Sequence, residues 1–175
     1  MAVPDFQSLM LPVLRILANG QELAPATVRE AAAKEFGLSE LDLKELLPSG
    51  RQTTFANRIA WALAYLKQAV IVESPRRGSY RITDRGREVL ASNPVRIDIS
   101  FLQQYPEFQA FRSAASETVS ASAPPGAAEP GALTPDEQMR LGYTRLRESL
   151  AALLLERAKQ GSPKFFEGLV VDLLV

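Results

Sequence analysis

"VIVESPRRGSYRIT", residues 70–83, contains two short runs rich in β-branched side chains on either side of a Pro-Arg-Arg-Gly-Ser turn. Runs of this kind, bounded by turn residues, predict two antiparallel strands joined in a β-hairpin, over residues 70–73 and 80–83. Arg76 and Arg77 occupy the turn, so the predicted hairpin has a basic tip. The segments on both sides have the apolar spacing of helices, and we expect a mostly α fold with this one small hairpin.

Three main helices are predicted before the hairpin. Residues 4–18 have apolar side chains at 6, 9, 10, 13, 14 and 17, which is a helical period. Residues 25–37 predict a second helix that ends at Gly37, and Ser39 with Asp42 gives the spacing of a capping box for a short helix. Residues 53–69 predict the third main helix, with a core-facing stripe of Phe55, Ile59, Ala62, Leu63, Leu66 and Ala69.

The chain beyond the hairpin divides into further segments. Residues 83–94 predict a helix capped by Thr83, and residues 97–111 predict another that is interrupted near Pro106. Residues 113–133 are rich in Ala, Ser, Pro and Gly and predict a flexible linker. Residues 134–160 then predict a long connecting helix, which opens on Thr134, and residues 161–175 begin a further apolar helix.

Composition excludes several kinds of chemistry. The 175 residues include no cysteine and no histidine, which rules out disulfides, thiolate catalysis, Ser-His-Asp triads and Cys/His metal sites. No run of about 18 apolar residues predicts a membrane span, and the N-terminus does not resemble a signal peptide, so a cytoplasmic location is expected. Net charge is zero, but residues 51–87 hold eight basic and two acidic side chains. A basic segment of this kind favours a polyanionic partner, although a solvated charged face is an equally good interpretation of charge alone.

Helices followed by a hairpin and a closing helix are typical of a winged helix-turn-helix, in which the last helix enters the DNA major groove and the hairpin, or wing, contacts the backbone. Both parts carry suitable side chains here. Arg and Gln or Asn can read guanine and adenine edges, Thr can contact either base type, and wing cations suit phosphates. The candidate DNA-binding residues are Arg51, Gln52, Thr53, Thr54, Asn57 and Arg58 at the helix start, and Arg76, Arg77 and Ser79 on the wing.

Two other classes stay open on these residues. The winged helix could serve protein interaction or dimerisation, with a homodimer formed through the 134–160 helix, where mostly apolar residues from Met139 to Arg157 follow a 3-4 spacing. A transcriptional regulator complete at 175 residues is the other alternative. The linker and the apolar segment 162–175 argue against a finished regulator.

Four segments carry a resemblance to a known family: "VPDFQSLMLPVLRILA", "VREAAAKEFGLSE", "LLPSGRQTTFANRIAWALAYLKQA" and "SPRRGSYRITDRGREVL". With these, residues 1–112 resemble the N-terminal domain of Mrr-type restriction endonucleases. Residues 134–160 correspond to the family's connecting helix, and "SPKFFEGLVVDLLV", residues 162–175, is similar to the first helix of its nuclease domain. The resemblance implies a type IV enzyme that finds methylated double-stranded DNA with the winged helix and cleaves it with a Mg²⁺-dependent PD-(D/E)xK-like domain.

The sequence departs from this family in two places. Val70 stands where the family tends to have glycine, so we expect that the third helix runs on or that the turn is strained. The family's catalytic Asp and Gln-x-Lys or Glu-x-Lys group lie beyond residue 175, and Glu167 alone cannot hold a metal. We therefore expect a chain that begins but does not complete the nuclease domain, binds DNA without cutting it, and has no catalytic residue, metal or cofactor of its own. Its last helix should be frayed, or buried against the 134–160 helix or a neighbouring chain.

Overall fold

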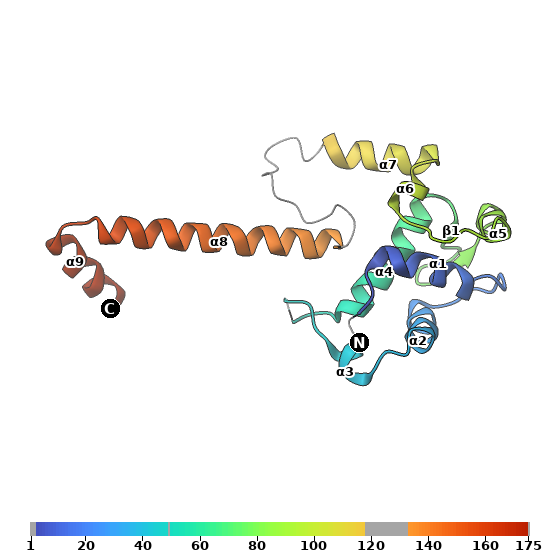
Figure 1. The fold of residues 1–175 in the computed structure, drawn as a ribbon, viewed down its shortest axis with the longest axis horizontal. Helices are drawn as coiled ribbons and strands as arrows, with labels where there is room; N and C mark the ends of the chain where they lie inside the picture. The colour runs from blue at the N-terminus through green and yellow to red at the C-terminus, as the bar shows by residue number, and fades with distance from the viewer. Residues whose placement is uncertain (1–2, 49, 118–132, 175) are drawn as a thin grey trace. The chain divides into compact units, whose positions relative to one another are not determined.

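The computed structural model describes residues 3–48, 50–117 and 133–174, and divides into two compact units, Met1–Thr134 and Pro135–Val175. The described residues are mostly helical, with one two-stranded antiparallel sheet (Figure 1). This agrees with the predicted fold class, and the order of the elements is consistent with a winged helix. No helix within the described ranges is both long and apolar enough to cross a membrane.

The helices before the hairpin lie where their apolar spacing predicts them. They are α1 (Phe6–Ile16), α2 (Pro25–Glu35), α3 (Glu40–Lys44) and α4 (Thr54–Gln68). Asp5 caps α1 by accepting from the backbone N–H groups of Gln7 and Ser8, and Ser39 and Asp42 form the predicted capping box of α3. These caps begin the helices at defined residues because each accepts N–H groups that have no partner inside the helix.

The hairpin consists of β1 (Val72–Glu73) and β2 (Arg81–Ile82), with Val72 opposite Ile82. Each strand is shorter than the four residues predicted. Tyr80 instead exchanges two backbone hydrogen bonds with Leu23, both 2.9 Å, which ties the hairpin to the loop between α1 and α2. The sequence around Leu23 has no strand pattern, so this pairing was not predicted.

After the hairpin come α5 (Asp84–Ala91), capped by Thr83, and then α6 (Ile99–Leu102) and α7 (Pro106–Glu117). The predicted helix over residues 97–111 is therefore two helices, separated before Pro106. Helix α7 continues five residues into the segment predicted as a linker, and residues 118–132 of that segment lie outside the described residues.

The core of the first unit forms where α1 packs against α4. Its largest fully buried side chains include Phe6, Leu9, Met10, Leu14, Ile59, Leu63, Leu66, Ile71, Ile82, Ile97 and Phe108. Tyr65 of α4 makes edge contacts with Phe6 and Trp61 at ring-centroid distances of 5.3 and 5.9 Å. Trp61 therefore packs against a neighbouring ring, and the packing of α1 against α4 leaves one face of α4 outward.

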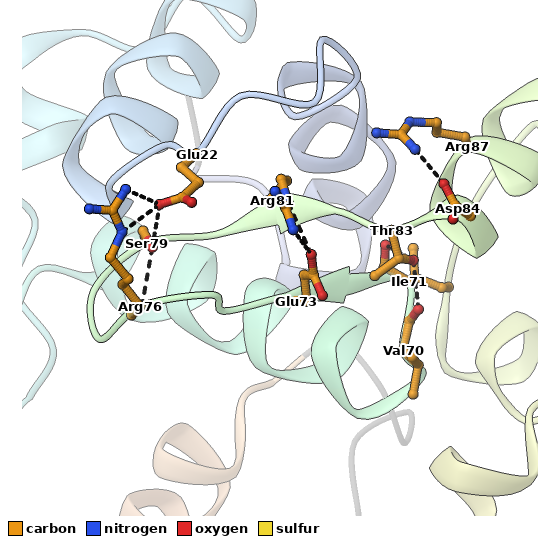
Figure 2. A network of polar contacts seen from close by, with 10 residues as sticks. All are labelled: Glu22, Val70, Ile71, Glu73, Arg76, Ser79, Arg81, Thr83, Asp84 and Arg87. Atoms are coloured by element: carbon orange, nitrogen blue, oxygen red, sulfur yellow. Dashed lines mark hydrogen bonds and ion pairs between the residues drawn. The ribbon is translucent and has the colours of Figure 1, made fainter.

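Val70 forms the turn between α4 and the hairpin in a left-handed conformation, with φ of +57°. The N–H of Ile71 donates to the Leu66 carbonyl and the N–H of Val70 to the Lys67 carbonyl, which is a Schellman motif. Thr83 Oγ1 donates to the carbonyl oxygens of Val70 and Ile71 at 2.8 and 2.9 Å (Figure 2). Of the two alternatives for this position, the strained turn is the one that the structure has, because these bonds hold a β-branched residue where glycine is normally found.

The second unit contains α8 (Pro135–Lys159) and α9 (Pro163–Leu174). The large apolar side chains that the structure describes on these two helices are exposed in the single chain, including Met139, Leu146, Leu150 and Leu153 on α8 and Phe165 and Val171 on α9. The C-terminal segment is helical over Pro163–Leu174. Its burial against a neighbouring chain stays a prediction.

Candidate nucleic-acid interface

The start of α4 is built by a tight turn that exposes two of the candidate residues. The N–H of Leu47 donates to the Gln52 carbonyl at 2.9 Å, and Gly50 within the turn has a φ of +67°. Thr53 caps α4, because its Oγ1 accepts from the N–H of Ala56. Arg51 and Gln52 are consequently exposed just ahead of the helix, with Thr53 half-buried behind them.

Two candidates at the helix start do not face outward. Thr54 and Asn57 are only 5% and 2% exposed, so the prediction that they form an outward polar face is wrong. Asn57 Oδ1 accepts from Thr134 Oγ1 at 2.9 Å, and Asn57 Nδ2 donates to Gln52 Oε1 at 3.5 Å. Thr134 lies 77 residues further along the chain, so helical periodicity around Asn57 could not reveal that a distant segment covers it.

Arg58 has a structural contact of its own. Its side chain is half-buried, and Nη1 donates to the carbonyl oxygens of Val3 and Pro4 at 2.7 and 3.1 Å. Charge-assisted bonds of this type fix the N-terminal segment to α4. Arg58 is therefore engaged with the protein backbone rather than pointing freely away from the helix.

Small side chains occupy the outer face of α4 beyond Thr53. Ala60 is exposed and Ala56 half-buried. Ala56 and Thr53 also border an open hollow of about 380 Å³ between α2 and α4, which Arg29 and Glu30 line from the α2 side. Sequence reasoning did not select Ala56 or Arg29, because an alanine on a helix carries no chemical signal and Arg29 lies outside the basic segment.

The wing tip is a folded polar cluster. Gly78 adopts a φ of +80° in its turn. Arg76 donates from Nε and Nη2 to Glu22 Oε2 at 3.0 and 2.9 Å, and Ser79 Oγ donates to the same oxygen at 3.4 Å (Figure 2). Ser74 Oγ donates to the Arg76 carbonyl at 2.9 Å and closes the turn. The tip is therefore held by side chains, and one of its two arginines already has an acidic partner.

Arg77 differs from its neighbour. It is exposed, and no hydrogen bond or ion pair engages it within the described residues. The two adjacent wing cations, which look equivalent in the sequence, are thus in different electrostatic states.

Other cations of the basic segment are paired as well. Arg81 pairs with Glu73 across the hairpin at 2.5 Å, and Arg87 pairs with Asp84 (Figure 2). Arg85 binds both carboxylate oxygens of Glu107 at 2.9 and 3.0 Å, and this hydrogen bonding holds the pKa of Glu107 below its usual value and raises the pKa of Arg85. The local excess of positive charge in the sequence is therefore partly offset in the fold, since Glu22 and Glu107 come from outside the basic segment.

The resemblance to nucleases raises the question of a Mg²⁺ site. Such a site needs several oxygen ligands, mainly carboxylates, gathered at one place. Among the residues that the structure describes, no group of three or more acidic side chains is arranged to hold a metal ion.

A helix with an exposed polar start, next to a hairpin with a basic tip, is the arrangement of a winged helix-turn-helix module. Residues 6–92 match the model of the Mrr N-terminal domain, and the chain belongs to this family. It is 32% identical over 184 aligned residues to the type IV methyl-directed restriction enzyme EcoKMrr of Escherichia coli (strain K12). That alignment covers 99% of this chain, which spans 59% of the relative's length. No solved structure matches the chain.

Proposed function

We propose that this chain is the DNA-binding part of an Mrr-type restriction endonuclease, and that it binds duplex DNA through the start of α4 and through the wing. The observation that carries the proposal is the exposed Arg51–Gln52 turn ahead of α4, together with Arg77 at the wing tip, in a chain of this family. A winged helix uses these two places to contact DNA.

We assign different roles to the candidate residues according to their burial. Arg51 and Gln52, which are exposed, and Thr53, which is half-buried, are the side chains that we assign to base edges in the major groove. Ala56 and Ala60 allow close approach and present methyl groups, which suit the C5 methyl of a pyrimidine. Thr54, Asn57 and Arg58 support the helix from inside, and Arg77, with Arg76 and Ser79, contacts phosphates.

We further propose that the DNA is methylated, following the name of the relative, which is a methyl-directed restriction enzyme. Cleavage with Mg²⁺ is proposed for the full-length family enzyme and is not assigned to any residue of this chain. A C5-methylated cytosine presents the same major-groove methyl as thymine, so the small outer face of α4 can accept both bases.

A second candidate function rests on α8. Four large apolar side chains, Met139, Leu146, Leu150 and Leu153, are exposed along it in the single chain. A face of this kind marks a protein contact in other proteins. We propose homodimerisation through α8 as this function. Sedimentation of the whole chain and of a Leu150→Lys variant tests it: the parent should sediment as a dimer and the variant as a monomer, while a monomeric parent would remove the proposal.

The DNA-binding proposal is tested by fluorescence anisotropy with a short labelled duplex, unmethylated or methylated on cytosine, over a series of salt concentrations. Each phosphate contact releases counterions, so the logarithm of the affinity should fall linearly with the logarithm of the salt concentration. Tighter binding of the methylated duplex would support methyl recognition by this domain. Affinity that does not change with salt would contradict the phosphate contacts of the wing.

A further inference from the structure

Glu22 reaches the wing from the loop between α1 and α2, although it lies 54 residues before Arg76. The next residue, Leu23, exchanges its two backbone hydrogen bonds with Tyr80 of the hairpin, both 2.9 Å. The Glu22 backbone is therefore fixed beside the wing by the pairing of its neighbour Leu23. Its carboxylate lies against the wing tip (Figure 2).

One oxygen of Glu22 contacts two side chains of the wing tip, Arg76 and Ser79. Oε2 accepts from Arg76 Nε at 3.0 Å, from Arg76 Nη2 at 2.9 Å and from Ser79 Oγ at 3.4 Å. These are donors that the proposed function offers to a DNA phosphate. A carboxylate oxygen and a phosphate oxygen are both anionic acceptors, and an arginine edge binds either in the same way.

We infer that Glu22 takes the place of a DNA phosphate at Arg76 in the free protein and thereby lowers the affinity of the wing for DNA of any sequence. The inference rests on the proposed function. Glu22 thus sets the DNA affinity of the wing through Arg76. Arg77 can bind a phosphate without first giving up an ion-pair partner among the described residues.

Exposure supports an exchange of partners at Arg76. The Arg76 side chain is 79% exposed and that of Glu22 is 28% exposed, so a phosphate can reach the guanidinium while the carboxylate stays near its present position. An exposed ion pair of this kind is weak, which keeps the exchange feasible. The carboxylate then lies next to the incoming phosphate, and the two like charges repel each other.

The consequence is a lower affinity for the DNA backbone without any change in base reading. Phosphate contacts give sequence-independent binding, whereas the start of α4 would read base edges. A carboxylate that competes at the wing therefore weakens binding to every duplex by about the same factor, and stable binding then depends on the contacts made by α4.

The test compares Glu22→Gln with the parent chain in salt titrations on the methylated and the unmethylated duplex. Glutamine keeps an acceptor oxygen for Arg76 and Ser79 and removes only the charge, and thermal unfolding should confirm that the variant is folded. We expect Glu22→Gln to bind both duplexes roughly fivefold more tightly at low salt. The slope of log affinity against log salt should steepen by about one.

Three further variants isolate the contact. Glu22→Asp keeps the carboxylate and should stay close to the parent. Glu35→Gln removes the same charge from the end of α2, where Glu35 is exposed, and should change the affinity less than Glu22→Gln. In an Arg76→Gln background, Glu22→Gln should have no further effect, because the residue through which Glu22 acts is gone.

Different failures point to different errors. A parent chain that shows no salt-dependent DNA binding overturns the proposed function, and the role of Glu22 falls with it. A parent that binds DNA, with a Glu22→Gln variant that is unchanged or weaker, overturns the role of Glu22 alone. An equal gain in the Arg76→Gln background would show that Glu22 acts only through its general charge.

Discussion

Asn57 of α4 accepts a buried hydrogen bond from the hydroxyl of Thr134, and the two atoms are 2.9 Å apart. The amide that the sequence offers as a base reader is thus engaged with the segment directly before α8. Its role in this chain is to join two distant parts of the first unit.

Replacing Asn57 with alanine should destabilise the fold and leave base preference unchanged. The substitution removes a buried acceptor, and a change of this kind costs about 1–3 kcal/mol. Urea unfolding of the whole chain measures the loss, and Thr134→Val should give a similar loss that does not add to the first. An Asn57→Ala variant with full stability and altered methyl preference would restore Asn57 to the DNA interface.

Replacing Val70 with glycine should stabilise the chain. Val70 has a φ of +57°, which costs a β-branched residue roughly 1–2 kcal/mol, and its side chain is 42% exposed, so little burial is lost. The added freedom of glycine in the unfolded chain offsets part of the gain, and about 0.5–1 kcal/mol should remain. Thermal unfolding measures the gain. Ala64→Gly, inside α4, is the control and should destabilise by about 1 kcal/mol.

Arg77→Ala should weaken DNA binding more than Arg76→Ala. Arg77 has no partner within the described residues, so its loss removes a phosphate contact and lowers the salt slope by about one. Arg76 is already paired with Glu22, so it contributes less than Arg77 to phosphate binding in the parent chain, and its loss should weaken binding less. Anisotropy titrations on one duplex compare the two variants. Equal effects would mean that the Glu22 contact does not distinguish these arginines.

Acid should weaken the ion pair between Arg85 of α5 and Glu107 of α7. The pKa of Glu107 lies below its usual value near 4.5, because Arg85 binds both of its oxygens. A lowered pKa in the folded chain means that ionised Glu107 stabilises the fold above the usual value and that this contribution disappears as pH falls through the lower, folded-state pKa. Urea unfolding from neutral pH downward should show a smaller acid-induced loss for Glu107→Gln than for the parent. An identical pH dependence would show that the pair contributes nothing.

Local sequence predicts most of this fold. The apolar periods of α1, α2 and α4 and the capping residues Ser39 and Thr83 lie where they were expected. These features depend on neighbours within one or two turns, which the sequence displays directly. The strain at Val70 was one of the two expected alternatives, because a Schellman turn needs a left-handed residue and a β-branched side chain disfavours that conformation.

The candidate site was less predictable, since its details depend on contacts between distant residues. Asn57 is covered by a segment 77 residues away, and Arg76 is neutralised by a carboxylate 54 residues before it. Helical periodicity gives the direction of a side chain around the helix axis but not what another part of the chain places over it. Charge counted along residues 51–87 likewise omits Glu22 and Glu107, which come from elsewhere.

The Leu23–Tyr80 pairing has a mechanical consequence. Two backbone hydrogen bonds hold the stem of the hairpin against the loop before α2, and the contacts of Glu22 with Arg76 and Ser79 hold its tip against the same loop. The distance between the wing tip and the turn at Arg51 is therefore set by contacts within the first unit. If the chain binds DNA as proposed, a duplex that contacts both places has to match that distance, and the stiffness of its base steps would then affect the affinity.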